Sequence, residues 1–153
     1  IRLNLILPMK VLAVDYGIKR VGLASGDDVS KVVFPKGVIF RKSDEQVVED
    51  LLKICEDFGY GKVVFGMPIN DEGKNKQAEI VDNFIAKFKI ILEEDFGEGR
   101  ELVLEIDTID ESFSSFEADG YLSDFSGKKI RIQEGDRDSM AAKVILERYF
   151  AEN

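Results

Sequence analysis

The hydrophobic period of the chain changes several times along its length, and the order of these changes constrains the fold more than any single motif. Residues 10–17, 20–28 and 31–40 are three successive apolar runs of strand length, and the turn residues after the first run predict a β-hairpin. Segments of helical and strand period then alternate to the end of the chain. This order predicts a mixed α/β sheet with helices on both faces.

The first helical segment, residues 43–59, has clear signals at both ends. Ser43 and Gln46 have the spacing of a capping box, and Gly59 follows the last apolar residue as a stop signal. Residues 78–97 form a second segment with apolar side chains every three or four residues. The remaining expected elements are strands over 62–70 and 100–110, a short helix over 114–122, and a helix over 139–150.

Length and composition predict one globular domain. The 153 residues are 44% hydrophobic and 33% charged, which is enough for a sizeable core. Met9 is a candidate natural start, so we expect a single domain over 9–153 and an extension of uncertain origin over 1–8. The opening apolar run is shorter than a signal-peptide core or a membrane span of about 20 residues. With one cysteine and no disulfide framework, a cytoplasmic protein is expected.

Charge and residue usage exclude several classes of function. The net charge of −9 argues against a uniformly basic surface for nucleic acid or membrane, although local basic clusters can act within an acidic chain. The chain contains no histidine, which excludes serine-protease-type triads and histidine-based zinc sites. Cys55 belongs to an apolar helical pattern and is expected to pack as a small hydrophobe rather than act as a nucleophile.

Acidic side chains lie where strands are expected to end. Asp15 closes the first apolar run, Asp110 and Glu111 follow the last strand, and Asp138 precedes the last helix. Sites in open α/β sheets gather outside the carboxyl ends of the strands. Oxygen ligands suit Mg²⁺, and paired metals can generate hydroxide and stabilise the leaving oxygen of a phosphodiester. These four acids are therefore candidate catalytic residues.

Each of these acids also has a structural interpretation that the residues alone leave open. Asp15 could end its strand in an Asx-type turn. Asp110 and Glu111 could be solvated loop acids, and Asp138 is suited to be the N-cap of the helix that follows it.

Four segments resemble the YqgF family, also called RuvX, in order and spacing: VDYGIKRVGLA, VVFGMPINDEGKNKQA, DESFSSFEA and DSMAAKVILERYF. The match spans nearly everything from Met9 onward. The family is described as Holliday junction resolvases and as pre-16S ribosomal RNA nucleases. The resemblance implies a ribonuclease H-like fold with a five-stranded mixed sheet. It also implies a nuclease dependent on Mg²⁺ or Mn²⁺. Asp15 and Asp138 are the implied metal ligands, and Glu111 is preferred to Asp110 as the third.

The resemblance also implies contacts with substrate. The loop that starts at Gly66 matches a family loop in which glycine permits close backbone approach, and Asn70 offers a donor to a phosphate or base. A plain strand-to-helix turn is the alternative for this loop. The candidate phosphate contacts are Lys19, Arg20, Lys74 and Lys76, with solvated side chains as the alternative.

One position departs from the family pattern. Ser112 stands where the family usually has an arginine after its acid pair, and serine supplies neither the charge nor the bidentate grip of a guanidinium. Either Arg20 or Lys128 substitutes, or activity and substrate preference differ.

The leading hypothesis is a metal-dependent endonuclease that hydrolyses phosphodiester bonds in structured nucleic acid. Its expected role is 5′-end processing of pre-16S rRNA or resolution of Holliday junctions, so the expected partner is pre-rRNA or branched DNA rather than a membrane. The alternative is a non-catalytic nucleic-acid-binding or ribosome-assembly factor with a decayed nuclease site.

Overall fold

A computed structural model of the chain describes residues 7–70, 73–97, 102–111, 121–123, 129–131 and 134–153. The strands are β1 Lys10–Asp15, β2 Arg20–Asp27, β3 Val33–Phe40, β4 Tyr60–Asn70, β5 Gly73–Lys74, β6 Glu105–Glu111, β7 Tyr121–Ser123 and β8 Lys129–Arg131. The helices are α1 Asp44–Phe58, α2 Lys76–Gly97 and α4 Glu134–Glu152.

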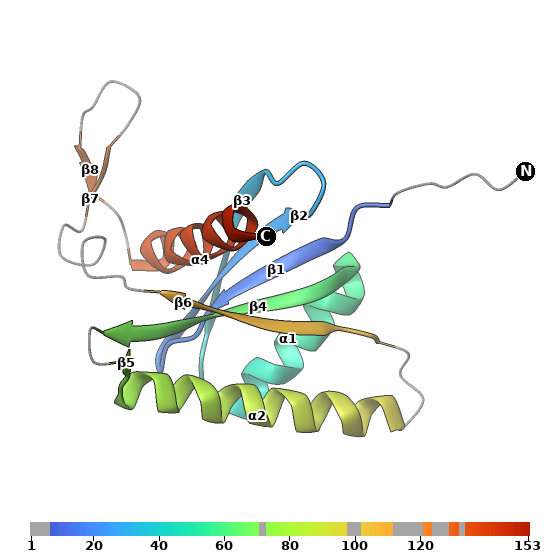
Figure 1. Ribbon diagram of the computed structural model, residues 1–153. Helices are drawn as coiled ribbons and strands as arrows, with labels where there is room; N and C mark the ends of the chain where they lie inside the picture. The colour runs from blue at the N-terminus through green and yellow to red at the C-terminus, as the bar shows by residue number, and fades with distance from the viewer. Residues whose placement is uncertain (1–6, 71–72, 98–101, 112–120, 124–128, 132–133) are drawn as a thin grey trace, which may run out of the picture.

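A mixed sheet forms the centre of the molecule. Strands β1, β2 and β3 make an antiparallel meander, β4 runs parallel to β1, and β6 runs parallel to β4. The order across the sheet is β3, β2, β1, β4 and β6, with β5 folded back on the end of β4. Helices α1 and α2 lie on one face and α4 lies on the other (Figure 1). The predicted fold class, a five-stranded mixed sheet flanked by helices on both faces, is confirmed.

The central strands divide their side chains between two cores. In β1, Leu12 and Val14 pack in the core that contains α1 and α2, whereas Val11 and Ala13 pack in the core that contains α4. Because successive side chains of a strand point to opposite faces, Asp15 lies on the α4 face of the sheet.

Helix α1 begins and ends as predicted. Ser43 Oγ accepts a hydrogen bond from the backbone N–H of Gln46, and the Gln46 side chain accepts from the Ser43 N–H, which completes the capping box. Gly59 forms the C-cap in the left-handed region, with φ of 73°. Cys55 is fully buried, and this burial raises the pKa of its thiol to about 12. The predicted packing role of Cys55 is therefore confirmed.

Two expected helices have other bounds in the structure, and two structural alternatives are excluded. The chain does not turn directly from β4 into a helix, because β4 first folds back on β5 as a hairpin. The short helix predicted over 114–122 does not extend to Tyr121 and Leu122, which lie in β7; the rest of that segment is outside the described residues. Helix α4 begins at Glu134, so Asp138 is inside the helix and is not its N-cap.

Among the described residues, no helix has both the length and the apolar character needed to cross a bilayer.

Candidate functional site

Three parallel strands bring two of the candidate acids to one edge of the sheet. Val14 of β1 pairs with Phe65 of β4, and the next residue of β4, Gly66, pairs with Ile109 of β6. Asp15 follows Val14, and Glu111 lies two residues beyond Ile109. Both carboxylates therefore come from the ends of strands that point the same way, toward the side where α4 begins (Figure 1).

The neighbours Asp110 and Glu111 point to opposite faces of the sheet. Ile109 packs in the α4 core, so Glu111, two residues later, shares its face while Asp110 does not. The Glu111 side chain is 3% exposed, and Asp110 is exposed. From α4, Arg148 Nη1 donates to Glu111 Oε1 at 2.7 Å, as expected for a carboxylate on that face. Glu111 thus lies on the same face as Asp15.

Gly22 allows α4 to approach the sheet beside Asp15. Gly22 is the partner of Asp15 across β1 and β2, and a Cβ at this position would lie 2.0 Å from the carbonyl oxygen of Asp138. The next residue of α4 fixes this approach, because Ser139 Oγ donates to Leu23 O at 3.0 Å and accepts from the Gly37 N–H at 3.1 Å. The start of α4 therefore brings Asp138 against the strand that neighbours Asp15.

Arginines pair with Asp138 and with Glu111 on this face. Arg20 Nε donates to Asp138 Oδ2 at 2.7 Å, and Arg148 pairs with Glu111 at the same distance. The other Glu111 oxygen, Oε2, is buried and has no hydrogen-bond partner within the described residues. Arg148 was missed by sequence reasoning, because an arginine on an amphipathic helix is usually solvated. Its place on the helix that carries Asp138 was the one available signal.

The acids fit a divalent cation by the chemistry of their donors. Mg²⁺ prefers carboxylate oxygens, and the unpartnered Oε2 of Glu111 is an acceptor in the interior that a cation would satisfy. Among the residues that the structure describes, no three His, Cys, Asp or Glu side chains are grouped closely enough to hold a metal ion. Instead, Asp138 and Glu111 face their arginines, so a cation shared with Asp15 would compete with Arg20 and Arg148.

A tight turn after β1 carries the predicted contacts Lys19 and Arg20. At Gly17 a Cβ would lie 2.4 Å from the carbonyl oxygen of Arg20, so the turn requires glycine. Lys19 is exposed, and Arg20 pairs with Asp138. Gly66 is buried in β4 between β1 and β6.

The other predicted contacts are only partly described. Asn70 and Lys74 belong to the β4–β5 hairpin, in which Asn70 pairs with Gly73, but their side chains are outside the described set. Lys76 is the exposed first residue of α2. Ser112 and Lys128 also fall outside the described residues.

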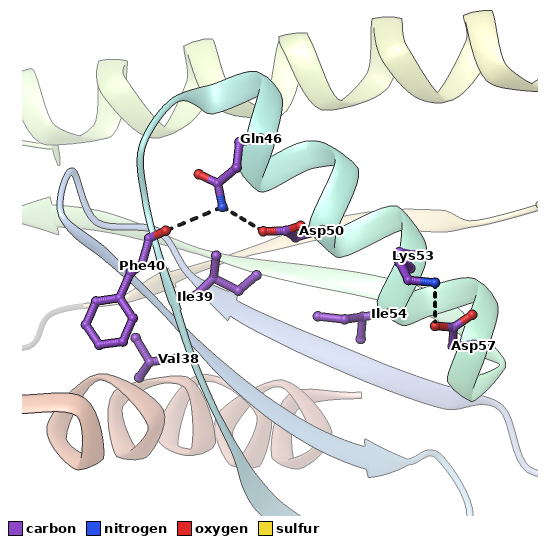
Figure 2. A pocket seen from close by; sticks show the side chains of 8 residues that line it. All are labelled: Val38, Ile39, Phe40, Gln46, Asp50, Lys53, Ile54 and Asp57. Atoms are coloured by element: carbon purple, nitrogen blue, oxygen red, sulfur yellow. Dashed lines mark hydrogen bonds and ion pairs between the residues drawn. The ribbon is translucent and has the colours of Figure 1, made fainter.

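A groove of about 360 Å³ lies between β3 and α1, and α1 covers the face opposite α4 (Figure 2). Its lining residues are Val38, Ile39, Phe40, Gln46, Asp50, Lys53, Ile54 and Asp57. Hydrogen bonds within the groove join Gln46 to Phe40 O and to Asp50, and an ion pair joins Lys53 to Asp57. None of the predicted site residues lines this groove, so it is separate from the acidic site.

Sequence comparisons place the chain beside known proteins over almost its whole length. A family model named RuvX and described as Holliday junction resolvase matches residues 9–152. A protein from Maridesulfovibrio salexigens is 35% identical over 144 residues, which cover 94% of this chain and 98% of that protein. A protein from a Sulfurovum species is 31% identical over 143 residues, covering 94% and 99%. Both are named "Putative pre-16S rRNA nuclease".

Solved structures share the fold at low sequence identity. RuvC of Thermus thermophilus in complex with a Holliday junction substrate superposes with a TM-score of 0.55 and 11% identity over 94% of both chains. Another Thermus thermophilus RuvC structure gives a TM-score of 0.52 at 12% identity, over 94% of this chain and 95% of its own. The protein therefore has the ribonuclease H-like fold of RuvC.

Proposed function

The chain belongs to the RuvX family, and from that membership we propose that it is a metal-dependent endonuclease that hydrolyses phosphodiester bonds in structured RNA. The observation that carries this proposal is that Asp15, Glu111 and Asp138 share one face at the carboxyl edge of the sheet. The relatives' name favours pre-16S rRNA as the substrate. The family's description makes a four-way DNA junction the competing substrate.

We assign the site's Mg²⁺ or Mn²⁺ to the carboxylates of Asp15, Glu111 and Asp138. Such a cation, when bound, lowers the pKa of a coordinated water and stabilises the leaving oxygen of a phosphodiester. The chain itself has no histidine to act as general base, so its acids are the groups that orient and activate the water.

We propose that the arginines that pair with the acids would bind phosphate groups of the substrate. With the Asp138 and Glu111 oxygens engaged by a cation, Arg20 Nε and Arg148 Nη1 would be able to donate to phosphate oxygens of the substrate. Arg148 also supplies a guanidinium beside Glu111, where Ser112 cannot provide one. We therefore propose Arg148, in addition to Arg20, as the cation that compensates for Ser112.

Cleavage of two labelled substrates tests the proposal. A precursor 16S 5′-end RNA and a four-way DNA junction are incubated with Mg²⁺, Mn²⁺ or EDTA. The parent is expected to cut the RNA only with metal, and Asp15→Asn and Glu111→Gln are expected to abolish cutting. Asp110→Asn is the matched control, because this neighbour faces the other side of the sheet and should keep the parent's rate.

The same experiment has outcomes that contradict the proposal. A parent that binds RNA but cuts neither substrate with any metal would replace the nuclease with a binding or assembly factor. Loss of cutting in Asp110→Asn, with Glu111→Gln unaffected, would overturn the choice between the two neighbouring acids.

A further inference from the structure

The residue after Asp15 is anchored on the opposite side of the sheet. The Tyr16 hydroxyl donates to Asp44 Oδ1 at the start of α1, and its ring stacks on Phe84 of α2 with 4.4 Å between centroids. Tyr16 is 5% exposed and Asp44 is 9% exposed, so this contact is buried. Burial, reinforced by Asp44, raises the pKa of Tyr16 to about 12 and keeps its hydroxyl a donor at neutral pH.

Asp44 accepts from two cations in addition to Tyr16. Arg41 Nε donates to Asp44 Oδ1 at 2.9 Å, and Lys87 Nζ of α2 donates to Oδ2 at 3.0 Å. Tyr16, Arg41, Asp44 and Lys87, here called the Asp44 cluster, therefore join the end of β1 to both helices of that face. A buried carboxylate is costly unless it is paired and hydrogen-bonded, and each Asp44 oxygen has at least one donor.

Arg41 extends the Asp44 cluster to the turn after β1. Its backbone N–H donates to Lys19 O at 2.9 Å, and its Nη1 donates to Ile18 O at 3.3 Å. The turn is thus held at Tyr16 by Asp44 and at residues 18 and 19 by Arg41. The same few residues bear Asp15 at one end and Lys19 at the other.

We propose that the Asp44 cluster is a positioning device that holds Asp15 and Lys19 for metal and phosphate without touching either ligand. This inference rests on the proposed function, since it assigns a purpose to contacts behind the same site. A fully satisfied buried polar network rigidifies its surroundings. Outer partners of metal ligands typically change metal affinity or activity by about 10–100-fold when they are removed.

Two cluster variants and two matched controls test the inference. Tyr16→Phe keeps the stacked ring and removes only the hydroxyl, and Asp44→Asn removes the charge that Arg41 and Lys87 share. Val48→Ala opens the buried face of α1 outside the cluster, and Asp57→Asn breaks the exposed pair with Lys53. Mn²⁺ affinity is measured by calorimetry, and exchange of the Arg41 amide, which donates to Lys19 O, is measured by NMR.

A positioning role and a purely packing role of the Asp44 cluster predict different results for these variants. We expect Asp44→Asn to weaken Mn²⁺ binding by about 10–100-fold and to speed exchange of the Arg41 amide, with Tyr16→Phe changing both in the same direction. Val48→Ala should lower Tm while keeping Mn²⁺ affinity within about twofold, since it acts through packing alone. The inference is overturned if both cluster variants match the parent, or if Val48→Ala loses Mn²⁺ affinity equally.

Failure of the proposed function would be recognised separately. A parent that binds no Mn²⁺ refutes the metal site itself, and the Arg41 exchange rate in Tyr16→Phe then decides the positioning role. Faster exchange there than in Val48→Ala supports the inference, and an equal or slower rate rejects it.

Discussion

Replacing Gly22 by alanine is expected to push Asp138 away from Asp15. The new Cβ would lie 2.0 Å from the Asp138 carbonyl oxygen, whereas real Cβ contacts shorter than 3.0 Å essentially never occur. The start of α4 and β2 must therefore separate by about 1.0 Å, the difference between 3.0 and 2.0 Å. Overpacking of this kind costs about 1–3 kcal/mol, which corresponds to roughly 2–12 °C in Tm for a domain of this size.

The catalytic rate should fall more than the stability loss explains. A displacement of about 1 Å at a catalytic group can cost about 100-fold in rate, so kcat of Gly22→Ala is expected to drop by that order. Gly61→Ala is the matched control, because the atoms nearest to its Cβ would belong to the flexible Met9 side chain, at 3.1 Å. A Gly22→Ala variant that keeps the parent's kcat would refute the role of Asp138. Equal losses in both alanine variants would indicate general destabilisation.

Three further perturbations follow from individual contacts. Arg148→Gln removes the guanidinium that pairs with Glu111, so the free energy of unfolding in EDTA should fall by about 1 kcal/mol. Mn²⁺ should then raise the Tm of this variant more than that of the parent. An equal rise in Tm would contradict the proposed competition between Arg148 and the metal ion. Burial raises the pKa of Asp44, but donors from Tyr16, Lys87 and Arg41 outweigh it and hold the pKa below 3.8. The stability from Asp44 is thus present above pH 3.8 and lost as pH falls below it, and acid titration of Asp44→Asn should show a shallower loss; a slope equal to the parent's argues against the network. The pKa of Cys55 rises from 9.0 to about 12, so its contribution is complete below pH 9.0 and is lost as pH rises toward 12. A thiol reagent should label native Cys55 no faster than the chain unfolds. Faster labelling would show that the core around Cys55 opens locally.

Local rules predicted the parts of the fold that depend on neighbouring residues. The capping box at Ser43 and the stop at Gly59 need only a few residues of context, and both appear as expected. The same holds for the hairpin of β1 and β2, where two apolar runs meet at a short glycine-containing turn. The edge where β1, β4 and β6 end follows from their parallel order, which the alternation of helices and strands already implied.

The choice between Asp110 and Glu111 required knowledge that the sequence lacks. Alternation along β6 puts the two side chains on opposite faces, but only the position of α4 tells which of them shares a face with Asp15 and Asp138. The pairs Arg148–Glu111 and Tyr16–Asp44 join residues 37 and 28 positions apart, so no local pattern indicates them. Sequence reasoning therefore proposed the acids as candidates, and it missed Arg148 and Asp44, which contact Glu111 and Tyr16.

The last helix begins earlier than predicted, and this changes the chemical role available to Asp138. An N-cap carboxylate accepts from the backbone amides of the first turn, which competes with binding a ligand. Gly135 and Asp136 have low helix propensity, so the sequence pattern did not indicate that the helix begins at Glu134. Because α4 begins at Glu134 and not at the predicted residue 139, Asp138 is past the N-cap position. Its side chain accepts a hydrogen bond from Arg20 at 2.7 Å, beside the strand that pairs with β1. Asp138 does not occupy the N-cap position, so the structural alternative falls away and the ligand role stays a prediction.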